Sequence, residues 1–184
     1  IFFTELDALI NVDLKTREPR SRKKKLKIIR IGTSGSLQED VPLGSHLISD
    51  YAVGFDNLMN FYNLEMTAFE EAIARDIQKK TGIPFTPYMV RCSALLKKQF
   101  GEDMMMGNTI TAPGFYAPQG REIRLPLKYP KLLEQVSRYQ HKTSNLRLTN
   151  FEMETAAYYA LARLLGHEAL SVNAIIANRT LNKS

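Results

Sequence analysis

An arginine stands inside an apolar run near the start of the chain. The segment "KIIRIGTSGS", Lys27–Ser36, places Arg30 among three isoleucines. Such a run predicts a strand buried on both faces, where a guanidinium is costly unless it meets an anion. Gly32 and Thr33 follow, and a glycine-bounded turn of hydroxyl residues predicts backbone amides that face an anion. A bound phosphate or a carboxylate elsewhere in the fold could neutralise Arg30, and the residues alone leave both open.

A second polar group lies in "GFYAPQGR", Gly114–Arg121. Phe115 offers a ring face for stacking, and Gln119 offers both a donor and an acceptor. Arg121 only donates and suits a carbonyl oxygen. A uracil ring presents such an edge, with two carbonyls that flank an N–H. An ordinary surface loop with an exposed phenylalanine is the competing interpretation.

Two carboxylates bracket a methionine in "NFEMET", Asn150–Thr155, at the expected start of a helix. Acidic residues in a first turn are favoured by the helix dipole, and this explains Glu154 well. It explains Glu152 less well, because Glu152 directly follows Phe151, where the chain enters the core. A carboxylate that accepts hydrogen bonds from a vicinal diol would be a positive use for it.

Strands and helices alternate along the chain, which predicts an α/β layer fold. In such sheets ligands bind at strand ends, and all three polar groups follow or adjoin predicted strands. The expected helices cover Phe3–Val12, Met66–Gly82, Ala94–Phe100, Pro130–Tyr139 and Asn150–His167, and the expected strands cover Leu26–Ile31, His46–Val53, Thr86–Arg91, a segment from Asn108, and Ala169–Ala177.

Composition is that of an ordinary globular domain, with 184 residues, 44% hydrophobic and 24% charged. We expect one domain over residues 1–184. The single Cys92 excludes an internal disulfide and favours a reducing, cytoplasmic setting. The histidines His46, His141 and His167 show no metal-ligand spacing with it, so no metal site is expected.

The segment Lys15–Lys27 holds eight basic residues and one glutamate. A basic run can bind nucleic acid. It can equally be a solvated loop that leads into a strand, and the lack of interleaved aromatic residues favours this second interpretation. We therefore expect no nucleic-acid partner. No apolar stretch reaches the roughly 18 residues that suggest a membrane span, so no membrane partner is expected either.

Five motifs together resemble the nucleoside phosphorylase family, and within it the uridine phosphorylase branch. They are "TELDAL", "IRIGTSGSLQ", "GFYAPQGR", "NFEMET" and "NAIIANR", in this order over nearly the whole chain. The resemblance implies a three-layer α/β/α fold with a central mixed sheet. It also implies phosphorolysis of uridine to uracil and ribose 1-phosphate, with inorganic phosphate as co-substrate and no other cofactor, in a homo-oligomer built from dimers, commonly hexamers.

The resemblance also implies a role for each motif residue. Catalysis would rest on Arg30, Thr33, Arg121 and Glu154. Phosphate would be bound by Arg30, Gly32 and Thr33; the base by Phe115, Gln119, Arg121, Ile176 and Ala177; and the ribose by Thr33, Glu152, Met153 and Glu154. Arg179 would tether a neighbouring loop.

The sequence departs from the family pattern at several points. Purine-specific relatives carry an aspartate shortly after the last strand, whereas this chain reads "IIANRT", which favours a pyrimidine substrate. The family's Gly-Asp-Pro phosphate loop, the arginine lent by a neighbouring subunit and the C-terminal helix have no counterpart in this sequence, and if the protein truly lacks them it is expected to be inactive. A purine nucleoside phosphorylase or nucleosidase of the same fold, and a basic nucleic-acid-binding module, are the alternatives.

Overall fold

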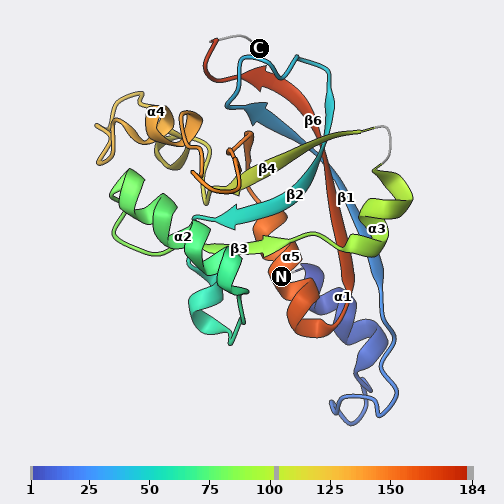
Figure 1. Cartoon of the computed structure of the whole chain (residues 1–184). Helices are drawn as coiled ribbons and strands as arrows, with labels where there is room; N and C mark the ends of the chain where they lie inside the picture. Colours follow the sequence, from blue (N-terminus) through green and yellow to red (C-terminus); the bar gives the residue numbers. More distant parts are fainter. Residues whose placement is uncertain (1, 102–103, 182–184) are drawn as a thin grey trace.

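A computed structural model describes residues 2–101 and 104–181 of the chain (Figure 1). Its α-helices are α1 (Phe2–Asn11), α2 (Ala68–Thr81), α3 (Ala94–Phe100), α4 (Leu132–Ser137) and α5 (Thr155–Leu165). Its strands are β1 (Lys27–Ser36), β2 (His46–Gly54), β3 (Tyr88–Arg91), β4 (Met105–Thr111), β5 (Asn150–Glu152) and β6 (Glu168–Asn178). Two short 3-10 helices, η1 (Leu58–Phe61) and η2 (Ala117–Gln119), lie in the connections.

The strands form one mixed sheet in the order β3-β2-β4-β5-β1-β6. The pairs β1–β6, β2–β4 and β4–β5 are parallel, and β1–β5 and β2–β3 are antiparallel. Strand β2 also pairs with β6 in an antiparallel sense, so the sheet curls until its β2 and β6 sides meet. This confirms the expected α/β class with a central mixed sheet.

Two hydrophobic cores flank the sheet. One includes residues of α1, α3 and α5, among them the fully buried Ala160, and the other includes residues of α2 and α4, such as Ile73 and Val136. The helices therefore cover both faces, as the layered architecture requires. In the described part of the chain no helix is long and apolar enough to cross a membrane.

Strand β1 differs from its prediction in two ways. It continues through Ser36 and pairs with β6 along its whole length, so a strand and not a turn follows Arg30. The isoleucines are also not buried on both faces: Ile29 is 40% exposed and Ile31 is 83% exposed. No described residue covers this outer face of β1 at Ile31, whereas Ile28 packs against the core on the other face.

The motif Asn150–Thr155 was predicted as the start of a helix, and this was wrong for its first half. Asn150–Glu152 forms strand β5, which pairs with both β4 and β1 and places Phe151 opposite Gly35. Helix α5 begins only at Thr155. Because both neighbours of β5 come from distant parts of the chain, pairing outweighs the local helical pattern.

Candidate active site

A cleft of about 520 Å³ lies where β1, β5 and β6 meet the loop that contains η2. It brings together all three polar groups found in the sequence, and every site residue that the resemblance implied lines it. The lining residues are Arg30, Gly32, Thr33, Ser34, Gly35, Phe115, Gln119, Arg121, Phe151, Glu152, Met153, Glu154, Ile176, Ala177 and Arg179.

The Arg30 guanidinium is held on two sides. Its Nη1 donates to Asn173 Oδ1 at 3.0 Å and to Ser171 Oγ at 3.3 Å, and both partners are fully buried on the adjacent strand β6. Its Nη2 forms ion pairs with the carboxylates of Glu154 and Glu152, the latter at 3.3 Å. Of the two partners considered for this cation, the structure shows carboxylates; the phosphate role stays a prediction.

The glycines of β1 provide space for cationic side chains. A Cβ at Gly32 would lie 2.5 to 2.7 Å from the Arg30 guanidinium, and one at Gly35 would lie 2.5 Å from Arg179 Nε. Real Cβ contacts are essentially never that short. Neither glycine has a positive φ. The predicted turn was therefore wrong, because this segment continues strand β1, and the two glycines make room for the cationic side chains; phosphate binding by Gly32 stays a prediction.

Glu152 and Glu154 differ sharply in how firmly they are held. Glu152 is buried; its Oε1 accepts a hydrogen bond from the Thr111 hydroxyl at 2.5 Å, and its Oε2 accepts from the backbone N–H groups of Glu154 and Thr155 at 2.9 and 2.8 Å. It thus orders the junction between β5 and α5. The Glu154 side chain is 48% exposed and contacts Arg30. Glu152 is fixed, whereas Glu154 can exchange its partner.

On the opposite wall, cations and an aromatic ring pack together. The Arg121 guanidinium lies 3.5 Å from the centroid of the Phe115 ring, and its Nη1 donates to the Phe115 carbonyl at 3.1 Å. One face of that ring is thus covered by Arg121. Burial lowers the pKa of Arg121, but arginine stays charged at neutral pH.

Gln119 is buried, and Arg179 Nη2 donates to its Oε1 at 2.6 Å. This contact confirms that Arg179 tethers the neighbouring loop. Because the guanidinium contains only donors, it also fixes which end of the amide is the oxygen. The sequence suggested that Gln119 offers a ligand both a donor and an acceptor; with Oε1 engaged, the Nε2 donors are its main contribution.

Sequence reasoning missed the polar residues beneath the cleft. Asn173 Nδ2 donates to Ser49 Oγ at 2.9 Å, Ser49 contacts Thr109, and Thr109 Oγ1 donates to Asn150 Oδ1 at 2.9 Å. Asn150 Nδ2 then donates to Ser34 Oγ at 3.0 Å. These hydrogen bonds connect Arg30, through its partner Asn173, to Ser34 farther along β1. The sequence did contain a signal, because Ser171 and Asn173 stand at alternate positions in the otherwise apolar segment 169–177.

The sequence pattern of the phosphorylase superfamily matches residues 24–183. The chain belongs to the phosphorylase superfamily. Two relatives are named uridine phosphorylase. The one from Thermococcus kodakarensis is 28% identical over 155 residues, and the one from Haemophilus influenzae is 27% identical over 160 residues. These matches cover 84% and 83% of this chain and 50% and 54% of the relatives, so this phosphorylase superfamily chain spans about half their length.

Among solved structures, a nucleoside phosphorylase from Trypanosoma brucei, described as showing uridine phosphorylase activity, is similar with a TM-score of 0.87 and 27% identity. The match covers 100% of this chain and 68% of the other. The fold of this superfamily member is thus the nucleoside phosphorylase fold, as the motif order implied.

Proposed function

We propose that the protein catalyses the reversible phosphorolysis of uridine to uracil and ribose 1-phosphate, a step of pyrimidine nucleoside salvage. The observation that carries the proposal is that one cleft holds a cation beside an exchangeable carboxylate and, on another wall, an oriented amide beside a second cation. Phosphate needs a cation, the ribose hydroxyls need a carboxylate acceptor, and a pyrimidine needs the donors of an amide and a cation. The names of the relatives support the same substrate.

In this proposal Arg30 binds phosphate through Nη2, while Ser171 and Asn173 keep Nη1 in place. Thr33, an exposed residue of the cleft, adds a hydroxyl donor. A phosphate oxygen attacks the anomeric carbon as the glycosidic C–N bond breaks, and the bonding electrons leave with the uracil ring. The protein positions the reacting groups and stabilises the developing charge, and these two effects provide most of the rate enhancement in transfers of this kind.

The leaving uracil carries negative charge over its ring nitrogen and carbonyl oxygens. Arg121 and the Nε2 donors of Gln119 stabilise that charge, and the ribose hydroxyls are bound by Glu154. Ile176 and Ala177 supply apolar contact for the base. The stretch "IIANRT", residues 175–180, contains no aspartate that could protonate a purine nitrogen, which agrees with a pyrimidine substrate. Neither a metal nor an organic cofactor takes part.

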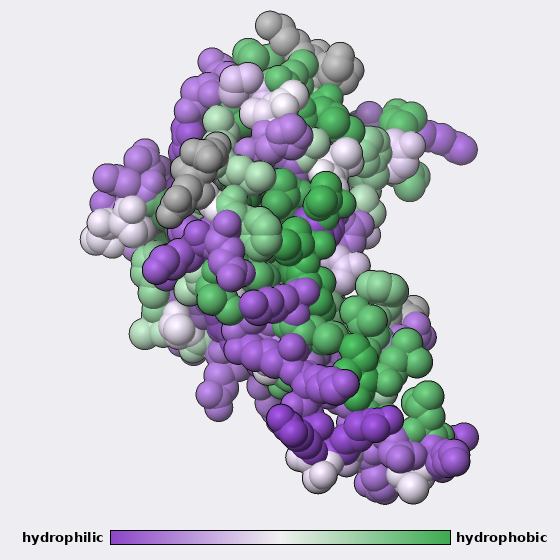
Figure 2. Space-filling view, turned by 90° about the vertical axis from the view of Figure 1, so that its right-hand side faces the viewer, coloured by the Kyte–Doolittle hydropathy of each residue, from purple (hydrophilic) through white to green (hydrophobic). Residues whose placement is uncertain are grey.

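We also propose that the protein works as a homo-oligomer whose contact face lies on the outer side of β1. Ile29 and Ile31 are exposed there, and Met104–Met106, around the start of β4, are exposed as well. Figure 2 shows hydrophobic residues gathered in a hollowed band on the side of the molecule that carries β1, β6 and α3. Contiguous exposed apolar surface of this kind is typical of protein–protein contacts. A second copy of the chain is the partner that the family resemblance implies.

The test is uracil release from uridine with and without phosphate, measured on the purified protein and on two arginine variants. Arg121→Ala is expected to lower kcat by roughly 10²- to 10³-fold, the usual cost of losing one donor to developing negative charge. Arg124→Ala, an exposed arginine of the same loop outside the cleft, is the matched control and is expected to keep full activity. Uracil release that does not depend on phosphate would mean a hydrolase and refute phosphorolysis.

A further inference from the structure

The positive charge of the chain is concentrated in one segment that the proposed function does not use. The chain has 25 basic and 19 acidic residues, and Lys15–Lys27, here called the basic arm, holds eight of the former and one of the latter. The remainder therefore carries 17 basic and 18 acidic residues. The whole excess of +6 comes from thirteen residues. Charge placed this unevenly is a surface property that can select an anionic partner.

The basic arm has a defined shape. The buried Asn11, at the end of α1, accepts a hydrogen bond from Lys24 N at 2.6 Å and donates to Lys24 O at 3.0 Å. Asp13 accepts from the backbone N–H groups of Lys15 and Thr16, and a bridge joins Val12 to Pro19. The backbone is thus folded back on α1, and the arm can meet a partner without first becoming ordered.

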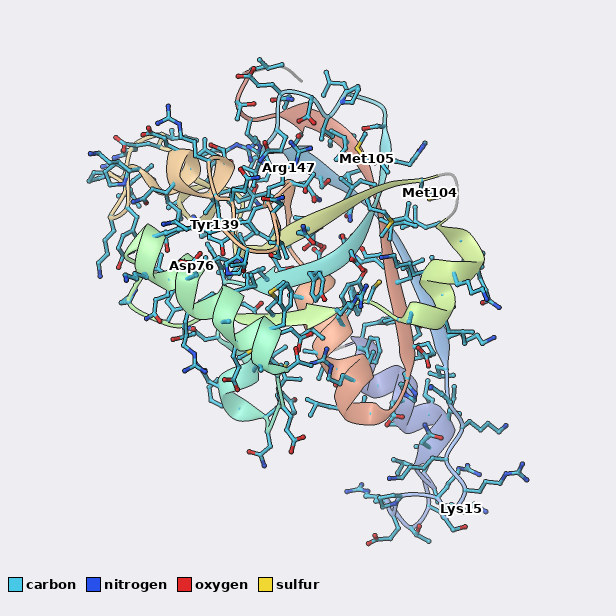
Figure 3. All side chains as sticks on the ribbon, in the orientation of Figure 1. Lys15, Asp76, Met104, Met105, Tyr139 and Arg147 are labelled. Atoms are coloured by element: carbon cyan, nitrogen blue, oxygen red, sulfur yellow. The ribbon has the colours of Figure 1, made fainter. Side chains whose placement is uncertain are left out.

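The cationic side chains of the arm point to solvent. All eight basic residues of the arm are exposed. Among the described residues, Lys25 alone of these eight forms an ion pair, and its partner is Glu168. Figure 3 shows Lys15 at the end of the molecule farthest from α4, where the arm extends beyond the body. A flat anionic surface could therefore contact the arm without being blocked by the rest of the protein.

Apolar side chains accompany these cations. Leu14, directly before Lys15, is 63% exposed, and Leu9 on α1 is 62% exposed. In Figure 2 the hydrophilic lower end of the molecule has hydrophobic residues beside it. The phosphate backbone of a nucleic acid provides no apolar contact for exposed leucines. Proteins bind single-stranded nucleic acid by stacking its bases on aromatic rings, and the arm has no aromatic residue. Clustered cations next to exposed apolar side chains are typical of proteins that lie on acidic membranes.

We propose that the basic arm binds the surface of membranes rich in anionic lipids. The cations contact the headgroups, and Leu14 enters the boundary between headgroups and acyl chains. The contact is peripheral and reversible, and it leaves the cleft free. It departs from the expectations of a merely solvated loop and of no membrane partner, and it is independent of the reaction proposed for the cleft.

Co-sedimentation with vesicles tests the proposal. Vesicles of phosphatidylcholine with about 30% phosphatidylserine should bind the full chain at low salt, and pure phosphatidylcholine vesicles should not. Each cation near an anionic membrane surface strengthens binding. The double variant Arg22→Ala with Lys23→Ala lacks two of them and should bind these vesicles roughly 30-fold more weakly. The matched control, Lys79→Ala with Lys98→Ala, removes two exposed lysines outside the arm and should bind as the unchanged protein does.

Leu14→Ser separates the membrane from other polyanions. It should weaken vesicle binding several-fold and leave binding to a mixed-sequence oligonucleotide unchanged. Three results would overturn the proposal: equal binding to neutral and anionic vesicles, equal loss in the control double variant, or oligonucleotide binding that is tighter than vesicle binding and insensitive to Leu14. The last would make nucleic acid the partner. Circular dichroism of each variant checks that the fold is retained.

Discussion

The ion pair between Arg30 and Glu154 makes a prediction in which two substrates respond in opposite directions. Phosphate and the Glu154 carboxylate compete for the same Nη2 of Arg30 in the proposed mechanism, and Glu154 is also the acceptor for the ribose hydroxyls. Glu154→Gln removes the negative charge and keeps the size of the side chain. Phosphate should therefore bind more tightly to the variant, whereas uridine should be used less well.

The size of the two effects follows from exposure. The Glu154 side chain is 48% exposed and that of Arg30 is 16% exposed, so the pair is worth about 0.5 to 1 kcal/mol. Phosphate that no longer has to displace the carboxylate should bind about two- to fivefold more tightly, since 1.4 kcal/mol corresponds to a factor of ten. A hydrogen bond to a charged acceptor contributes about 1.5 to 3 kcal/mol, so kcat/KM for uridine should fall by roughly 10- to 100-fold.

Isothermal titration with phosphate gives the Kd, and initial rates at saturating phosphate give kcat/KM for uridine. Glu71→Gln is the matched control, because Glu71 forms an ion pair with Arg75 on α2 and has a similar side-chain exposure of 42%. It should change neither quantity. An unchanged or weaker phosphate affinity in Glu154→Gln would show that Arg30 and phosphate do not meet as proposed. A fall in both affinities to the same extent would point to a general distortion of the cleft.

Two further predictions concern assembly and stability. Ile31→Asp places a charge on the outer face of β1 and should shift the protein toward monomers in sedimentation velocity; an unchanged distribution would exclude this face from the contact. Burial raises the pKa of Glu70, but hydrogen bonds from Arg163 and the backbone N–H of Thr67 outweigh it, so its pKa lies below 4.5. A carboxyl whose pKa is depressed by folding stabilises the fold above that value and loses this contribution as pH falls. Glu70→Gln weakens the charge-assisted hydrogen bonds from Arg163 and should thus cost about 2 kcal/mol of unfolding free energy at pH 7. The cost should become progressively smaller below pH 4.5, as measured by urea denaturation; a constant difference across pH would contradict it.

The composition of the cleft could be predicted because its residues are chemically out of place in the sequence. Arg30 in an apolar run and Glu152 next to the core residue Phe151 each pose an electrostatic problem that only a partner solves. The order of the motifs then placed these residues in one fold. Helix α2 was equally accessible, since Thr67 and Glu70 form a capping box and Gly82, with a φ of 68°, ends it.

Other features depend on contacts between distant segments and leave little local signal. Strand β5 has only three residues, and its existence depends on β4 and β1, some forty and more than one hundred residues away. The exposure of Ile31 depends on which elements pack over β1, and an apolar run in the sequence does not show whether any element covers that face. The role of Gly32 could not be predicted either, because a sequence does not show whether a glycine is needed for its small size or for its freedom in φ.

The contacts of Arg30 show how a partly buried cation can be held in place along one edge while its other edge faces an exchangeable carboxylate. Nη1 is bound by Asn173 and Ser171, which are neutral and buried, so the position of the guanidinium does not depend on any anion. Nη2 faces Glu154, which solvent reaches, and the fixed Glu152 lies 3.3 Å away. In the proposed mechanism an incoming phosphate would therefore replace only a half-exposed ion pair, and the cost of exchanging anions would be small. The released Glu154 carboxylate would then be free to accept from the ribose hydroxyls.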